Sequence, residues 1–166
     1  MEPLSQREVG LISWLEFHKK YFFTSSDVDS FAKTRTQRYN MIKNLVRKKR
    51  IIKLNKVKYY LIPIRAKSGA WAEHPFIIVD EMMDGKDYII GGWAAANYWK
   101  LSDQIPFRID IFTTQRQGSL IVMNTKLEFH RTSANKLEKA VIKQIQDHEF
   151  RILSEEETNK WLKSHQ

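Results

Sequence analysis

The stretch "TRTQRYNMIKNLVRKKR", Thr34 to Arg50, contains seven basic residues and no acidic residue. Its apolar residues recur at the three- and four-residue spacing of a helix. A helical wheel places one group on the side expected to pack inward, namely Tyr39, Ile42, Leu45, Val46 and the stem of Lys49. The stretch therefore predicts a helix with an apolar inner side and a cationic outer side.

The outer side of this helix carries side chains that can contact DNA. Arginine pairs with guanine O6 and N7, asparagine and glutamine pair with adenine N6 and N7, and lysine or threonine can hold phosphates. The candidate residues on the helix are Arg35, Thr36, Gln37, Arg38, Asn40, Lys43, Asn44 and Arg47. A basic helix taken alone is more often a solvated face of a core helix, so the neighbouring segments decide between the two interpretations.

Two further helices are predicted before this stretch. "SQRE", Ser5–Glu8, fits a capping box, and the apolar stripe after it predicts a core-packing helix that runs towards Lys20. "SSDVDSFAK" follows the β-favouring run "YFFT" and predicts a short second helix capped by Ser25 or Ser26. The basic stretch then supplies the third helix.

A basic hairpin is predicted after the third helix. "RIIKLNKVKYYLIP" has two β-rich runs, residues 51–54 and 57–62, joined at "NK". Three lysines lie along the hairpin or at its tip, where they could contact phosphates: Lys53, Lys56 and Lys58. Three helices followed by a basic hairpin predict a winged helix-turn-helix, in which the third helix enters the DNA groove.

The net charge of +9 is distributed unevenly. Residues 1–65 hold 15 Lys and Arg against 5 Asp and Glu, whereas residues 66–166 carry a net charge of −1. This indicates a nucleic-acid-binding module joined to a nearly neutral one. Double-stranded DNA is the expected partner, because single-strand binders expose aromatics between their basic residues. A basic helix on a membrane surface is the competing interpretation, and it would need a broad apolar face.

The expected setting of the protein is cytoplasmic and soluble. The chain has no cysteine, which excludes disulfides, thiolate catalysis and cysteine-based zinc sites. The residues after Met1 lack the apolar core of a signal peptide, and no apolar run approaches the ~20 residues that span a bilayer. No membrane partner is therefore expected.

The charge excess ends in "PIRAKSGAWAEHP", residues 63–75, which is rich in Pro and small residues. We therefore predict a winged helix-turn-helix domain at 1–64, a linker at 65–74 and a second domain at 75–166. Three β-rich runs, "FRIDIFTT", "SLIVM" and "KLEFHRT", are followed by a helical candidate, Ala134–His148, and a polar closing helix. The second domain is predicted to be a small α+β domain, and the fold class of the chain is α+β.

Catalysis is not expected from this sequence. Nucleotidyltransferases place a Gly-Gly turn before a helix and a D-x-D pair of acids on the next strand, where the acids hold two cations. This chemistry also needs a Gly-Ser after the strand, but here Trp93 replaces the serine after Gly91-Gly92, and Phe112 occupies the second acid position after Asp110. The glycines are expected to allow close packing of a helix on a strand, with Asp110 paired to a basic group. No histidine spacing indicates a metal site, and no cofactor is predicted.

"FTSSDVDSFA" followed by "NLVRKKRIIKLNKVKYYLIP" resembles the amino-terminal winged-helix domain of the AbiEi antitoxin family of type IV toxin–antitoxin, or abortive-infection, systems. The second domain continues the resemblance in "LSDQIP", residues 101–106, and "RILSEEET", residues 151–158. The family often has glycine at the end of the third helix and at the hairpin tip, where this chain has Arg50 and Lys56.

The resemblance implies a DNA-binding transcriptional regulator. As an antitoxin, the protein would repress its own operon and oppose a nucleotidyltransferase-like toxin. The alternative, from another functional class, is a protein-interaction module that uses the winged helix as a docking scaffold and does not bind DNA.

Overall fold

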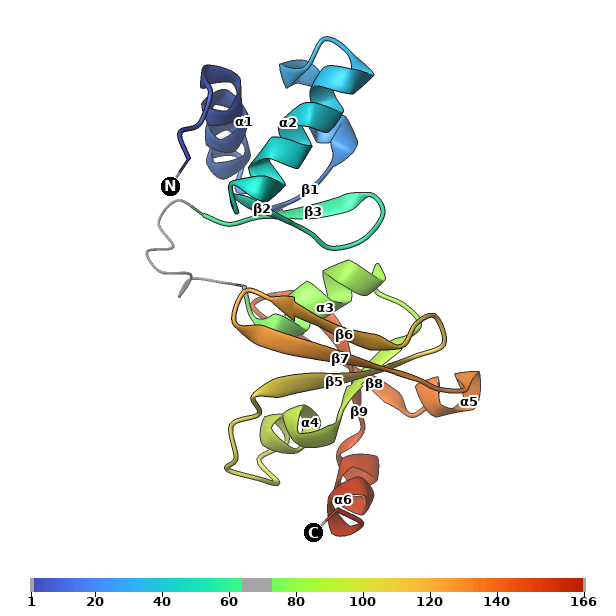
Figure 1. Cartoon of the computed structure of the whole chain (residues 1–166). Helices are drawn as coiled ribbons and strands as arrows, with labels where there is room; N and C mark the ends of the chain where they lie inside the picture. Colours follow the sequence, from blue (N-terminus) through green and yellow to red (C-terminus); the bar gives the residue numbers. More distant parts are fainter. Residues whose placement is uncertain (1, 64–72, 166) are drawn as a thin grey trace. The chain divides into compact units, whose positions relative to one another are not determined.

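The computed structural model describes residues 2–63 and 73–165 (Figure 1). It divides the chain into two compact units, Met1–Ala72 and Glu73–Gln166. Both units combine helices with a sheet, and the described residues form seven helices and two sheets, so the fold is α+β. Most of the predicted linker 65–74 lies outside the described residues; of its two described positions, His74 caps a helix of the second unit.

The described residues of the first unit form three helices and three strands. In chain order they are α1 (Gln6–Phe17), β1 (Phe22–Thr24), the 3₁₀ helix η1 (Ser25–Phe31), α2 (Arg35–Arg47), β2 (Ile51–Lys53) and β3 (Lys58–Leu61). The strands form an antiparallel sheet in the order β1-β3-β2, in which Phe23 pairs with Tyr59 and Ile52 with Tyr60. The two runs expected to pair as a hairpin form β2 and β3, and the run "YFFT" adds β1 as a third strand.

The predicted second helix is more tightly wound than a regular α-helix. It is a 3₁₀ helix that begins after Thr24, whose backbone N–H donates to Asp27 Oδ2 (2.8 Å), so neither Ser25 nor Ser26 is the cap. Serine and aspartate compete with helical hydrogen bonds through their own side chains, and this segment holds five of them in seven residues. These residues favour a short, tightly wound turn over a regular α-helix.

The inner side of α2 differs from the predicted one. Met41, Ile42 and Leu45 are buried, whereas Tyr39 is 63% exposed and Val46 is 40% exposed. The helix is thus rotated so that Met41, and not Tyr39, faces the core. These α2 residues join a cluster with others from every element of the unit, Leu11, Ile12, Leu15, Phe23, Val28, Ile51, Tyr59 and Leu61.

A buried ion pair ties the end of α2 to the start of α1. The predicted capping box is present, because the Ser5 N–H donates to Glu8 Oε2 (2.6 Å) and the Glu8 N–H donates to Ser5 Oγ (3.3 Å). Lys48 Nζ donates to the same Glu8 oxygen (2.8 Å) and to the carbonyl of Pro3 (2.8 Å). Burial raises the pKa of Glu8, but the hydrogen bonds from Lys48 and Ser5 outweigh it and hold that pKa below its ordinary value.

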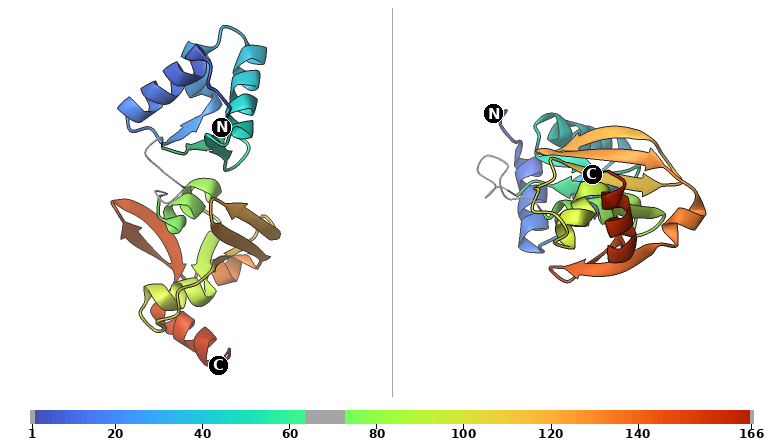
Figure 2. Two further views of the ribbon diagram at one scale, coloured as in Figure 1. Left: turned by 60° about the vertical axis from the view of Figure 1, so that its left-hand side comes forward. Right: turned by 90° about the horizontal axis from the view of Figure 1, so that it is seen from below.

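The second unit is built on one mixed six-stranded sheet (Figure 2). Its elements are α3 (Pro75–Met83), β4 (Tyr88–Gly91), α4 (Gly92–Tyr98), β5 (Arg108–Thr113), β6 (Gly118–Val122), β7 (Thr125–Arg131), α5 (Ala134–Leu137), β8 (Ala140–Ile145), β9 (His148–Leu153) and α6 (Glu155–Lys163). The strand order is β6-β7-β5-β4-β9-β8, with parallel pairing at β5–β7 and β4–β9 and antiparallel pairing elsewhere.

The prediction of a helix over Ala134–His148 is wrong. Only one turn of helix forms, as α5, and the chain then pairs β8 with β9 as an antiparallel hairpin. The apolar residues that indicated a helix, Leu137, Val141 and Ile145, are four apart, and this spacing also places residues on one face of a strand. The β-branched side chains of Val141 and Ile145 favour a strand over a helix, and pairing with β9 stabilises that strand.

None of the helices among residues 2–63 and 73–165 combines the length and the apolar character needed to cross a membrane.

The Glu8–Lys48 pair gives the first unit a pH-dependent stability. A depressed folded-state pKa means that ionised Glu8 stabilises the fold above its ordinary pKa of 4.5, and that this contribution disappears as the pH falls through the lower folded value. Glu8→Gln should therefore lower the free energy of unfolding by about 1–3 kcal/mol at pH 7, since it leaves the Lys48 ammonium without its carboxylate. The difference from wild type should shrink well below pH 4.5.

Urea unfolding of the full chain at pH 7 and at pH 3 measures this difference. Glu2→Gln is the matched control, because Glu2 forms an exposed ion pair with Arg47 (3.1 Å), and such pairs contribute about 0–1 kcal/mol. An equal loss from Glu8→Gln at both pH values would contradict the assignment.

Candidate nucleic-acid interface

The exposed face of α2 is set by the burial of Met41, Ile42 and Leu45 on the opposite side. The helix starts at the predicted place, because the Gln37 N–H donates to Thr34 Oγ1 (3.2 Å) and makes Thr34 the cap. Seven side chains lie on the exposed face: Arg35, Thr36, Tyr39, Asn40, Lys43, Val46 and Arg47. Five of them are among the predicted DNA-contacting residues.

Three predicted residues lie on the flanks of this face. Gln37, Arg38 and Asn44 are half-buried. Gln37 Oε1 accepts a hydrogen bond from the Lys33 N–H (3.0 Å), and Arg38 pairs with Asp29 of η1. These contacts hold Gln37 and Arg38 within the unit, so they are placed to position α2 rather than to project from it.

The hairpin turns without glycine. Asn55 Oδ1 accepts hydrogen bonds from the N–H groups of Val57 (3.0 Å) and Lys58 (2.9 Å), and this closes the tip. None of the residues in the tip has a positive φ. Lys53 and Lys56 are exposed, whereas Lys58 is half-buried at the start of β3.

The end of α2 also forms without glycine. The left-handed residue is Lys49 (φ 55°), and the resemblance had indicated the next position, Arg50. The Lys49 N–H donates to the Val46 carbonyl (2.9 Å) and the Arg50 N–H donates to the Leu45 carbonyl (2.9 Å), which is the Schellman pattern.

A groove of about 390 Å³ separates the exposed face of α2 from the hairpin. It is lined by Ser25, Arg35, Arg38, Tyr39, Ile42, Lys43, Val46, Lys53 and Tyr59. The sequence did not single out Tyr39 and Val46 for this surface, because the wheel placed them inward. A helical wheel with Met41 on the inner side would have placed Tyr39 and Val46 on the exposed side.

Much of the positive charge in this region is not paired with carboxylates of the described residues. Residues 34–63 contain no Asp or Glu. Two acids of the first unit pair with cations of α2, Glu2 with Arg47 and Asp29 with Arg38. The others are engaged in the pairs Glu8–Lys48 and Asp27–Lys20 and in contacts of Glu16. Arg35, Lys43, Lys53 and Lys56 form no ion pair with any residue in the described ranges. These four cations can therefore attract phosphates without first breaking internal pairs.

Two features of the second unit bear on catalysis. Asp110 is buried, with His130 Nε2 at 2.8 Å and Arg108 Nε at 3.3 Å, so the expected pairing of Asp110 with a basic group is confirmed. A Cβ at Gly92 would lie 2.7 Å from Asp110 Oδ2, which explains why glycine opens α4. In the part of the chain that the structure describes, no three His, Asp or Glu side chains gather as a metal site would require.

No protein-family model matches the chain, and no curated protein sequence matches it at a significant level. The interface described above is therefore the evidence from which a function can be argued.

The hairpin should weaken when the Asn55 side chain is removed. Asn55→Ala leaves the Val57 and Lys58 N–H groups to water, and we expect a loss of about 0.5–1.5 kcal/mol from the local stability of the hairpin. Amide hydrogen exchange at β2 and β3 measures this loss. Exchange in α1 should remain unchanged and serves as the internal control; unchanged exchange at Lys58 would contradict the role of Asn55.

Proposed function

We propose that the protein is a DNA-binding transcriptional regulator whose first unit is a winged helix-turn-helix. In this proposal η1 and α2 form the helix-turn-helix, and β2–β3 is the wing. The observation that carries the proposal is the exposed face of α2, whose cations and amides lie beside two exposed wing lysines in a segment without a carboxylate. The groove between α2 and the hairpin adds a concave surface that is also lined by cations.

The geometry supports a division of roles within the interface. An α-helix fits the major groove, so the exposed face of α2 can reach base edges. Asn40 and Arg35 project from this face and are the side chains best placed to read bases, and Lys43 with Arg47 can hold flanking phosphates. Lys53 and Lys56 would contact phosphates from the wing.

We further propose that the protein acts as an antitoxin that represses its own operon and opposes a nucleotidyltransferase-like toxin. The resemblance to the AbiEi family supports this, together with the loop that carries "LSDQIP". Ile105 is 85% exposed and Phe107 is 79% exposed, both in the segment between α4 and β5. Exposed apolar side chains of this size are favourable contacts for a protein partner.

Replacing lysines of the interface should weaken DNA binding in a salt-dependent way. Lys43→Ala or Lys56→Ala should reduce affinity for every duplex and lower the slope of log K against log salt by about one, because each lysine neutralises about one phosphate. Asn40→Ala should instead change the preference among sequences. Fluorescence anisotropy with a duplex from upstream of the protein's own reading frame, at two salt concentrations, measures both effects.

Arg7→Ala is the matched control, because Arg7 is an exposed cation on α1 and does not line the groove. If the wild-type protein bound no duplex while it still bound a protein partner, the docking-scaffold alternative would be correct. If Lys43→Ala and Lys56→Ala behaved like Arg7→Ala, DNA binding would have to use another surface.

A further inference from the structure

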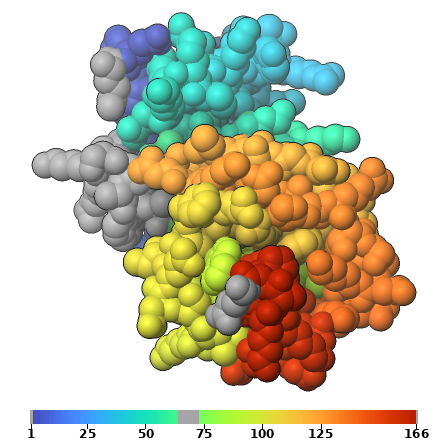
Figure 3. Space-filling model, turned by 60° about the horizontal axis from the view of Figure 1, so that its bottom comes forward, coloured from blue at the N-terminus to red at the C-terminus, as the bar shows by residue number. Residues whose placement is uncertain are grey.

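The second unit contains a hollow of about 510 Å³ that the proposed function does not use. Figure 3 shows the side of the unit on which α6 lies beside the segment that includes α5. The hollow is lined by Gly92, Phe112, Asn135, Lys136, Lys139, Leu153, Glu157, Lys160, Trp161 and Ser164. Its walls therefore come from the start of α4, from β5, from α5 and the residues after it, from the end of β9 and from α6.

The lining is more cationic than the unit that contains it. Three of the lining residues are lysines and one is a glutamate. Glu156, which is not a lining residue, also pairs with Lys160 (2.7 Å), so the three lysines face two carboxylates. Residues 66–166 as a whole carry a net charge of −1. The positive charge of the hollow is thus a local arrangement and does not follow from the composition of the unit.

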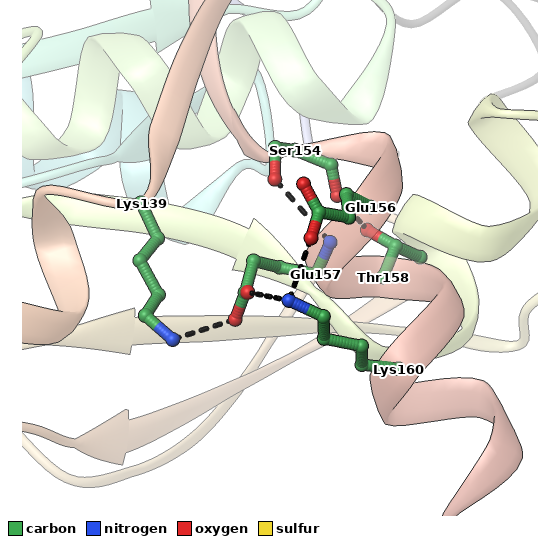
Figure 4. Close-up of polar contacts among 6 residues, drawn as sticks. All are labelled: Lys139, Ser154, Glu156, Glu157, Thr158 and Lys160. Atoms are coloured by element: carbon green, nitrogen blue, oxygen red, sulfur yellow. Dashed lines mark hydrogen bonds and ion pairs between the residues drawn. The ribbon is translucent and has the colours of Figure 1, made fainter.

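Glu157 holds two of the lysines together at this site. Its carboxylate accepts hydrogen bonds from Lys139 Nζ (2.6 Å) and from Lys160 Nζ (3.0 Å), as Figure 4 shows. The Ser154 cap fixes the first turn of α6 through the Glu157 N–H (3.3 Å). Hydrogen bonds with Glu156 and Glu157 raise the pKa of Lys160 to about 12, so the ammonium stays charged. The site already holds an anionic group between two ammonium groups, one from the segment between α5 and β8 and one from α6.

Lys136 is the third lysine, and it has no carboxylate partner among the described residues. Its Nζ lies 3.7 Å from the centroid of the Phe112 ring. Burial, together with repulsion from Lys139, lowers the pKa of Lys136. Asp110 on β5 does not compensate it, because that carboxylate is engaged by Arg108 and His130. An anion that entered the hollow would give Lys136 its missing partner.

We propose that this hollow binds a small phosphorylated molecule. Lys136, Lys139 and Lys160 would hold its phosphates, since lysine acts as a point charge towards phosphate. The volume lies within the range of small-molecule sites and exceeds what a single phosphate requires. Phe112, Leu153 and Trp161 would cover the rest of the ligand. The proposal is independent of DNA binding by the first unit.

Isothermal titration calorimetry of the full chain tests this site, with pyrophosphate, ATP and adenosine as probes. Pyrophosphate and ATP should bind, and adenosine should not. Lys136→Ala should weaken ATP binding at least about tenfold. Glu157→Gln should strengthen it, because the neutral amide no longer competes with phosphate for Lys139, while Lys160 keeps its pair with Glu156 (2.7 Å). Lys163→Ala, an exposed lysine of α6 outside the hollow, is the control and should leave the affinity unchanged.

The opposite effects of Lys136→Ala and Glu157→Gln separate a ligand site from a structural cluster, because loss of structure cannot strengthen binding. Tighter binding of ATP than of pyrophosphate would show that the rest of the nucleotide is also recognised, and equal binding would show recognition of phosphate alone; both results support the site. Three results would overturn it: no binding of either phosphate compound, unchanged affinity in both variants, or loss of ATP binding in a Lys43→Ala, Lys53→Ala double variant, which would place ATP on the first unit.

Discussion

The burial of Met41, Ile42 and Leu45 is the constraint on which the account of the first unit depends. Each of these side chains contributes about 1.5–3 kcal/mol when fully removed from water. A rotation of α2 by one residue would expose part of this area and carry cationic side chains towards the core. The same packing therefore stabilises the unit and selects which side chains project into solvent. The Lys48–Glu8 pair then anchors the end of α2 to α1.

The positions of the carboxylates determine which cations form ion pairs within the protein and which remain unpaired on its surface. Lys20, Arg38 and Lys48 pair with acids that belong to η1 or α1, and these contacts hold the helices together. The exposed face of α2 and the hairpin carry no acid at all. The arrangement in the second unit is different, because there Glu157 lies between two lysines that line a hollow. Both arrangements leave cations that an external anion can satisfy.

Much of the first unit could be predicted because its signals are local. The capping box at Ser5 and the two β-rich runs each depend on a few neighbouring residues. The rotation of α2 could not be predicted, because Tyr39 and Met41 are both apolar enough to face the core and only the packing of α1 and the sheet distinguishes them. The helix prediction for residues 134–148 was wrong for a related reason, since a spacing of four residues fits both a helix and a strand.

The phosphate site could not be predicted, because its parts are distant in the sequence. Phe112, Lys136 and Lys160 meet only through the sheet order and the position of α6. Each lysine taken alone resembles an ordinary surface charge. Similarly, the hairpin tip without glycine depends on the Asn55 side chain, whose hydrogen bonds replace the conformational freedom that glycine would provide.

The central claim, that the exposed face of α2 and the hairpin form a DNA-binding surface, is tested most directly by mapping amide chemical shifts while a DNA duplex is added to the protein. The account predicts shift changes at Arg35, Asn40 and Lys43 and at the hairpin tip around Lys56, with little change in α1 and in the second unit. Shift changes confined to the second unit, or none at all, would contradict it.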